Sequence, residues 1–331
     1  KRMGEQEKRL GIDYSFSPVL DINTNPKNPI IGNRSYGSSS SRVSRQAMAI
    51  MKGHHEAGIL TSGKHFPGHG DTAKDSHKTL PTVTFSSERI NKVELEPYRK
   101  LINEGLSSIM VAHLNVPSIS KEGLPTSLSK DVIQDILKDE LDFKGLVVTD
   151  ALNMKGVSEY SKVRNIDLTA FLAGHDILII SNDISKGINS IIKAYNSGKV
   201  SEKRLSYSVK KILKAKYKVG LNEYAPVDLN NLYDDLNTID DEELNYQAVG
   251  NSLTLLKNNN NLLPLKTKSN IGHIILGDDS GKAFEKQLRK YHYIEKVNDI
   301  KSINVLEKTA SLDTIIISFH RSNSTPWKAS N

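Results

Sequence analysis

The chain has 331 residues, 37% of them hydrophobic and 25% charged, which is enough for about two globular domains with a sizeable core. Its net charge of +7 comes from basic residues scattered along the sequence, which favours a solvated surface and no nucleic-acid partner. It has no cysteine, which excludes disulfides, thiol catalysis and cysteine-ligated metals. No apolar run approaches the ~20 residues that a membrane span needs.

The first two thirds of the chain predict five buried strands with helices between and after them. The strands are expected at 12–21, 59–65, 108–113, 145–150 and 176–180. The helices are expected at 1–10, 38–58, 87–105, 129–141, 166–173, 184–196 and 201–219. Near-continuous apolar strands that alternate with helices indicate a parallel βα repeat. Such a repeat either closes into an eight-stranded barrel or forms an open, doubly wound sheet.

The last third predicts a second α/β region. Residues 221–241 have little periodicity and are expected to be a linker, followed by a helix at 242–250. Strands are expected at 252–257, 271–277 and 314–319, with a helix between the last two.

Polar residues stand at the ends of four successive strands of the repeat: Asp21, His65, His113 and Asp150. The carboxyl ends of barrel strands carry catalytic residues, so this arrangement favours the barrel over the open sheet. An aspartate in the position of Asp150 is also compatible with a helix cap, and the role of His113 stays open.

The loop after the second strand carries the densest chemistry, running from Lys64-His65-Phe66-Pro67-Gly68-His69-Gly70 to Asp75-Ser76-His77. Asp75 could orient the His77 imidazole and raise its basicity, although an Asx turn beside a surface histidine has the same sequence. His65 and His69 have the spacing of metal ligands on a helix, but Pro67-Gly68 prevents a helix there. The sequence therefore favours no metal and no cofactor.

Taken together, this loop and Val148-Thr149-Asp150-Ala151-Leu152 resemble glycoside hydrolase family 3. Within that family, the chain is most similar to the bacterial β-N-acetylglucosaminidases that carry an Asp-His dyad. Three further segments resemble the same family: 17–21, Gly32-Asn33-Arg34-Ser35-Tyr36-Gly37, and Ser252 to Leu265.

The resemblance implies specific roles for six residues. Asp150 would be the nucleophile of a retaining glycosidase, and His77, partnered by Asp75, would be the general acid/base. The resemblance further implies that Arg34, Lys64 and His65 bind the hydroxyls of an N-acetylglucosamine ring. Asp21 could support Arg34 or be structural.

The resemblance also implies the domain organisation. Residues 1–220 would be the C-terminal part of a (β/α)8 TIM-type barrel, with about five of its eight βα units. Residues 221–241 would be a linker, and 242–331 would begin the family's C-terminal α/β sandwich domain. We therefore expect a fragment that is inactive and of low stability alone, because five strands leave two open edges. The resemblance also implies a bacterial protein, and export or association with the cell wall is one localisation that it allows.

The predicted function is that of an exo-acting, retaining β-N-acetylglucosaminidase. Its carbohydrate substrate would be a glycan that contains N-acetylglucosamine, and cell-wall muropeptides would place it in peptidoglycan recycling. The alternatives are a family-3 β-glycosidase of other specificity and an enzyme that transfers the sugar to phosphate. A catalytically inactive sugar-binding module is the alternative of a different class.

Overall fold

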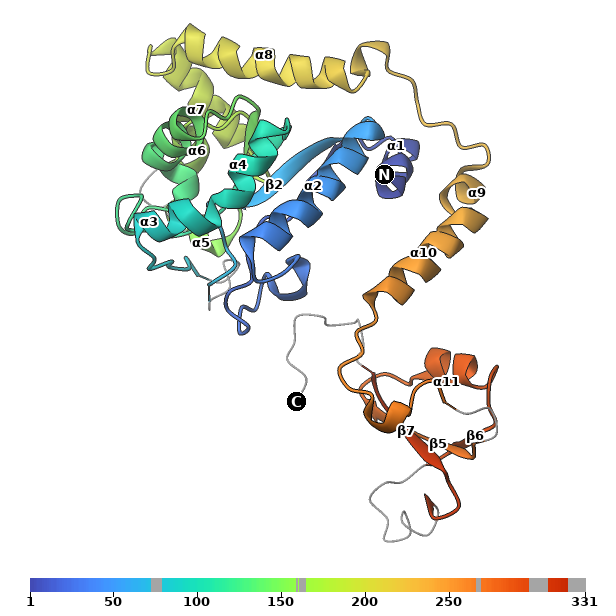
Figure 1. Cartoon of the computed structure of the whole chain (residues 1–331). Coiled ribbons are helices and arrows are strands. Elements are labelled where there is room, and N and C mark those ends of the chain that lie inside the picture. The colour runs from blue at the N-terminus through green and yellow to red at the C-terminus, as the bar shows by residue number, and fades with distance from the viewer. Residues whose placement is uncertain (73–78, 159, 161–164, 266–268, 298–308, 321–331) are drawn as a thin grey trace. The chain divides into compact units, whose positions relative to one another are not determined.

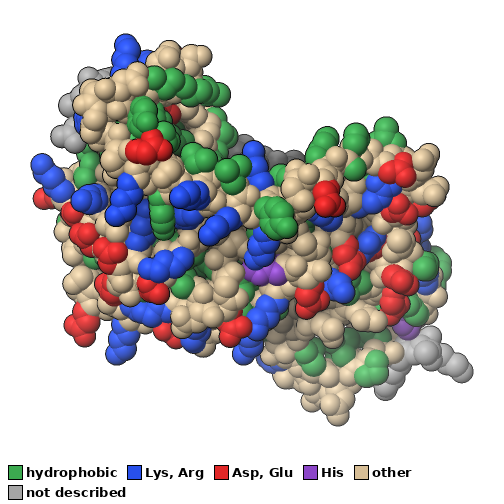
Figure 2. All heavy atoms as spheres, turned by 90° about the horizontal axis from the view of Figure 1, so that it is seen from above, with side chains coloured by type: hydrophobic (Ala, Val, Ile, Leu, Met, Phe, Trp, Pro, Cys, Tyr) green, Lys and Arg blue, Asp and Glu red, His purple; other side chains and the backbone are tan. Residues whose placement is uncertain are grey.

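The computed structural model forms two compact units, Lys1–Thr238 and Ile239–Asn331. It describes residues 1–72, 79–158, 160, 165–265, 269–297 and 309–320. In this described part, no helix is both long and apolar enough to cross a membrane. On the face shown in Figure 2, Lys and Arg side chains alternate with Asp and Glu, without gathering into one patch.

The first unit is built on a parallel sheet whose four strands follow the order of the sequence. They are β1 (Tyr14–Ser15), β2 (Leu60–Phe66), β3 (Ser108–Val111) and β4 (Leu146–Thr149). All four side chains of β3 and all four of β4 are buried, as expected for strands covered on both faces.

The first strand is much shorter than the predicted 12–21. After Ser15 the chain still follows β2, because the Lys64 N–H donates to Pro18 O at 3.1 Å and Val19 forms an isolated bridge with Lys64. Pro18 has no N–H to donate to a ladder, and its peptide bond with Ser17 is cis. Asp21 is nevertheless carried to the carboxyl end of the sheet.

The prediction of a regular strand at 176–180 is wrong. Ile177 pairs with Val148 of β4 through one isolated bridge. Beyond it, the Ile179 N–H donates to the side-chain Oγ1 of Thr149 at 2.9 Å, so a side chain replaces the next ladder bond. Ile180 then has a φ of 47°, which turns the chain away from the extended conformation.

Helices follow the strands as the βα repeat requires (Figure 1). The longer helices are α1 (Arg2–Arg9), α2 (Ser40–Glu56), α4 (Glu96–Asn103), η4 (Asp131–Glu140), α6 (Ile166–Ala173), α7 (Ile184–Asn196) and α8 (Glu202–Lys218). The shorter ones are η1 (Gly32–Arg34), α3 (Ser87–Arg89), η2 (Ile90–Glu94), η3 (Thr126–Leu128), α5 (Lys155–Ser158), η6 (Leu221–Glu223) and α9 (Leu232–Leu236). The side chains of Ser39, Asn165, Asp183 and Ser201 cap α2, α6, α7 and α8 by accepting a backbone N–H of the first turn.

The main core lies between β2, β3 and β4 and the helices α2, α4 and η4. Its largest side chains include Tyr98 and Phe66, whose rings meet edge to face with centroids 5.0 Å apart. Leu137 of η4 is fully buried in the same core. Packing against these helices holds the strand ends in fixed positions.

The segment 221–241, predicted to be a linker, carries α9 and is bound to α1. The Arg9 guanidinium donates to Asn230 O at 2.7 Å and to the Asp235 carboxylate at 2.8 Å. Arg2 donates to Asp235 O at 2.6 Å. These contacts hold α1 and α9 together within the first unit.

The second unit contains a three-stranded parallel sheet in the order β6-β5-β7 (Figure 1). The strands are β5 (Ile271–Gly277), β6 (Ile294–Lys296) and β7 (Thr314–His320), and the helices are α10 (Ile239–Ser252), η7 (Asn259–Asn261) and α11 (Lys282–Leu288). The short β6 was not predicted. The predicted strand at 252–257 is wrong: Ser252 ends α10, and Leu253, Leu255 and Leu256 are exposed, with no strand pairing in the described structure.

Two substitutions in the core test this packing. We expect Leu137→Ala to lower the free energy of unfolding by about 2–5 kcal/mol, because it removes buried methyl groups and leaves a cavity. Tyr98→Phe should leave that free energy unchanged or raise it, because the buried Tyr98 hydroxyl has no hydrogen-bond partner in the described structure. Urea unfolding measures both; a large loss of stability in Tyr98→Phe would contradict the described packing.

Candidate active site

A pocket of about 270 Å³ opens at the carboxyl ends of the strands of the first sheet. Four of the residues predicted from the sequence line it: Arg34, Lys64, His65 and Asp150. Arg34 comes from η1, Lys64 and His65 from the end of β2, and Asp150 directly follows β4. The structure thus brings together side chains that are up to 116 residues apart (150 − 34).

Lys64 and His65 both face this pocket although they are consecutive in a strand. In a regular strand, successive side chains point to opposite faces. The pairing of β2 with β3 shifts register between Lys64 and Phe66, which leaves His65 as an extra residue without a partner on β3. A bulge of this kind redirects side chains, and here it allows two adjacent polar residues to line one pocket.

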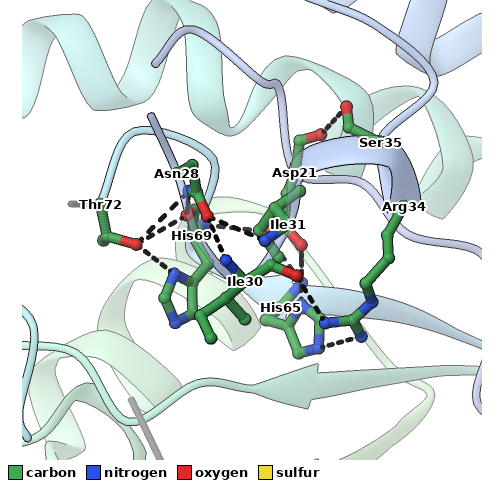
Figure 3. A network of polar contacts seen from close by, with 9 residues as sticks. All are labelled: Asp21, Asn28, Ile30, Ile31, Arg34, Ser35, His65, His69 and Thr72. Atoms are coloured by element: carbon green, nitrogen blue, oxygen red, sulfur yellow. Dashed lines mark hydrogen bonds and ion pairs between the residues drawn. The ribbon is translucent and has the colours of Figure 1, made fainter. Parts of the chain in front are cut away.

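The buried Asp21 carboxylate holds His65 in place (Figure 3). His65 Nδ1 lies 2.7 Å from Asp21 Oδ2, and the backbone N–H groups of His65 and His69 donate to Asp21 Oδ1 at 3.2 Å and 2.7 Å. Burial raises the pKa of Asp21, but the His65 and His69 side chains and the bonds that these residues donate outweigh it, so that pKa lies below its usual value.

The partners of His65 also determine its tautomer. A carboxylate can only accept, so Nδ1 carries the proton that it shares with Asp21. The other ring nitrogen, Nε2, lies 3.5 Å from Nη2 of Arg34, and a guanidinium can only donate. Asp21 therefore supports His65 and, through it, Arg34; among the described residues it makes no direct bond to the Arg34 side chain.

The charges around the pocket suit a negatively charged Asp150. Burial raises the pKa of Asp150, but His65, His113 and the Ala151 N–H, which donates to Oδ1 at 2.8 Å, hold that pKa below its usual value. Burial lowers the pKa of Lys64, and the Arg34 charge lowers it further, while the carboxylates of Asp150 and Asp21 raise it. The pocket thus pairs an ionised carboxylate with donors from a lysine and an arginine.

His69 is a pocket residue to which the sequence assigned no sugar-binding role. The residue is 2% exposed, its Nδ1 lies 2.6 Å from Thr72 Oγ1, and its Nε2 has no hydrogen-bond partner in the described structure. Burial lowers its pKa, so the ring is neutral. Its position four residues after His65 suggested only metal-ligand spacing, whereas the structure places the residue in the lining of the pocket.

The backbone around His69 is fixed by Asn28. The Asn28 amide Nδ2 donates to His69 O at 2.8 Å, and Asn28 Oδ1 accepts hydrogen bonds from the N–H groups of Ile30 and Ile31 (Figure 3). This one side chain therefore connects the His69 loop with the loop that leads to Arg34.

The other predicted residues are not among the described residues that line the pocket. His113 is fully buried behind the pocket and does not line it. Asp75 and His77 lie outside the described residues. In the described part of the chain, no group of three or more His, Asp or Glu side chains is placed to hold a metal ion.

Comparison with known proteins relates this arrangement to one family. Residues 1–215 match the model of the glycosyl hydrolase family 3 N-terminal domain. The beta-hexosaminidase A of Pseudoalteromonas piscicida is 29% identical over 310 residues, which cover 87% of this chain and 51% of that protein. The chain thus spans about half the length of this curated relative.

Solved structures match the fold of most of the chain. A family 3 beta-N-acetylglucosaminidase from Paenibacillus sp. str. FPU-7 is 30% identical with a TM-score of 0.78, over 96% of this chain and 64% of that one. A structure named as a beta-glucoside phosphorylase is 25% identical with a TM-score of 0.84, over 99% of this chain and 65% of that one.

The depressed pKa of Asp21 leads to a prediction about stability and pH. We expect Asp21→Asn to lower the free energy of unfolding by about 3 kcal/mol at pH 7, because it removes a buried charge that has several partners. The pKa of Asp21 in the folded protein lies below its unfolded value near 3.8. The difference in free energy of unfolding between Asp21→Asn and the parent should therefore have its full size above pH 3.8. This difference should disappear as the pH falls below the pKa that Asp21 has in the folded protein.

Urea unfolding of both proteins at pH 7 and near pH 3 tests this dependence. Asp131→Asn, at an exposed position in η4, controls for the loss of one negative charge and should stay close to the parent. A penalty for Asp21→Asn that is equal at both pH values would contradict the role given to the Asp21 carboxylate.

Proposed function

The chain belongs to glycosyl hydrolase family 3, and we propose that it carries the sugar-binding site of a retaining, exo-acting β-N-acetylglucosaminidase. The observation that carries this proposal is the pocket itself: an ionised carboxylate, Asp150, shares one wall with Arg34, Lys64 and His65. The names of the relatives, beta-hexosaminidase and beta-N-acetylglucosaminidase, support the substrate class. Cell-wall muropeptides are the proposed source of the sugar.

The proposed reaction has two steps at the anomeric carbon. In the first, an oxygen of Asp150 attacks this carbon, the bond to the aglycone oxygen breaks, and that oxygen takes a proton from the His77 imidazolium. In the second, neutral His77 takes a proton from water as the water oxygen attacks the same carbon. The bond to Asp150 breaks, and the sugar leaves with retained configuration.

The acid/base assignment rests on the sequence, since Asp75 and His77 lie outside the described residues. An imidazole has an unperturbed pKa of about 6.5, so it can give and accept a proton near neutral pH. Asp75 would orient the His77 ring and stabilise its charged form.

Arg34, Lys64 and His65 are proposed to bind the hydroxyls of the sugar. Lysine and arginine donate charge-assisted hydrogen bonds, which position the ring against Asp150. The bulge that turns both Lys64 and His65 into the pocket supports this role. His69 is a further polar residue that lines the same pocket.

The fold proposal follows the same family membership. The strands β1–β4 and the segment 176–180 are proposed to be part of a (β/α)8 barrel, with 1–220 in the catalytic domain. Residues 221–241 would link it to 242–331, which would belong to the family's C-terminal α/β domain. The parallel sheets and the structural matches to family members support this organisation.

A second candidate is transfer of the sugar to phosphate. A histidine acid/base would not repel an anionic acceptor as a carboxylate does, and one structurally similar protein is named as a beta-glucoside phosphorylase. Four basic or imidazole side chains, Arg34, Lys64, His65 and His69, surround the one carboxylate, Asp150, among the described residues that line the pocket.

Replacement of Asp150 tests the mechanism in the full-length enzyme. We expect Asp150→Ala to lower kcat for an aryl N-acetyl-β-glucosaminide by 10⁴-fold or more, on the order of losses measured for other enzyme nucleophiles. Asp183→Ala, which removes a helix-capping carboxylate away from the pocket, is the control and should keep kcat near the parent value. Near-normal hydrolysis by Asp150→Ala would reject the assigned nucleophile, and an inactive parent would favour the sugar-binding module.

The acceptor is tested by analysing the products with and without inorganic phosphate. For a hydrolase, we expect free N-acetylglucosamine as the main product under both conditions, at rates that phosphate does not raise. Formation of mainly N-acetylglucosamine 1-phosphate when phosphate is present would replace the hydrolase with the second candidate.

A further inference from the structure

His113 lies directly behind the pocket, two residues beyond the end of β3. We propose that His113 is a positioning residue: its hydrogen bond to Ala151 holds the backbone beside Asp150, so that the Asp150 carboxylate points at the anomeric carbon. This proposal rests on the proposed role of Asp150 as nucleophile. His113 itself touches neither the pocket nor, by this proposal, the substrate.

The hydrogen bonds of His113 fix its tautomer. Nε2 lies 3.0 Å from the carbonyl oxygen of Ala151, which can only accept, so Nε2 carries a proton. Burial lowers the pKa of His113, so the ring is neutral and Nδ1 keeps its lone pair. Nδ1 therefore accepts the hydroxyl proton of Ser127, whose Oγ lies 2.6 Å away.

The Asp150–Ala151 backbone is held at two points, by the last residue of β3 and by His113, which follows β3. The Asp150 N–H donates to Val111 O at 3.0 Å, and the Ala151 carbonyl accepts from His113. Between these two anchors lies the Ala151 N–H, which donates to Asp150 Oδ1 at 2.8 Å. A change in the Ala151 backbone would move this N–H, and the carboxylate would lose the bond that sets its orientation.

This arrangement differs from an ordinary buried histidine in what it contacts. His175 is also fully buried, but its Nε2 lies 2.9 Å from a different acceptor, the carbonyl oxygen of Ser127. In His113, both ring nitrogens are bonded, and one bond ends at the residue next to the nucleophile. Attack on a sugar carbon depends on the direction of the carboxylate, and a small misplacement lowers the rate of the chemical step.

A positioning role predicts a split between kcat and KM, because His113 does not line the pocket that binds the sugar. We expect His113→Phe, which keeps the ring shape and removes both hydrogen bonds, to lower kcat by on the order of 10- to 100-fold with KM little changed. His113→Gln should recover most of the lost kcat, because its side-chain amide can again donate to the Ala151 carbonyl.

The experiment compares these variants in the full-length enzyme with an aryl N-acetyl-β-glucosaminide, alongside thermal unfolding. Leu137→Ala, a core variant of lowered stability, is the control and should keep the parent kcat below its unfolding temperature. A His113→Phe enzyme that is folded and has the parent kcat would overturn the proposal, and so would a His113→Gln enzyme no faster than His113→Phe.

A third variant decides the matter if His113→Phe does not fold. Ser127→Ala leaves the imidazole in place and removes only the hydroxyl that holds the ring at Nδ1, opposite the nitrogen bonded to Ala151. We expect a several-fold lower kcat with unchanged KM; an unchanged kcat would then overturn the proposal. A parent enzyme that neither hydrolyses nor transfers the sugar would instead refute the proposed function, so the two failures are distinguishable.

Discussion

The buried carboxylate of Asp21 connects the segments that form one wall of the pocket. It accepts hydrogen bonds from the His65 ring, the His65 backbone and the His69 backbone, and its own backbone carbonyl accepts from Ser35. A buried charge persists only where such partners replace water. The loop after β2 and the loop that leads to Arg34 therefore meet at one residue, and the orientation of His65 follows from it.

The pocket uses this arrangement to keep one carboxylate ionised among positive and neutral donors. Lys64 and Arg34 repel each other, and Lys64 is attracted by the carboxylates of Asp150 and Asp21. A neutral sugar that enters the pocket displaces water from these groups and gains their hydrogen bonds in a less polar environment. This balance fits a nucleophile that must be charged before the reaction and neutralised as the covalent bond forms.

Much of this structure could be predicted from the sequence, and the reasons for the failures are physical. The bounds of α6, α7 and β5 agree with the apolar periodicity, and the ends of β2 and β4 were close enough to bring Lys64, His65 and Asp150 together. Periodicity cannot anticipate that a Thr149 side chain replaces a ladder bond at Ile179, or that the leucines of 252–257 find no strand to pair with in the described structure. The pairing of Asp21 with His65, and the free nitrogen of His69, depend on three-dimensional contacts that no local pattern contains.

The central claim is that Asp150 forms a covalent bond to the sugar. The most direct measurement is mass spectrometry of the proteolysed full-length enzyme after incubation with a 5-fluoro N-acetylglucosaminyl fluoride, whose ring fluorine slows release of the sugar from the enzyme. The account predicts one added fluorosugar on the peptide that contains Asp150, and slower labelling when excess N-acetylglucosamine is present as a competing ligand. A label on another residue, or turnover of substrate without any label, would contradict it.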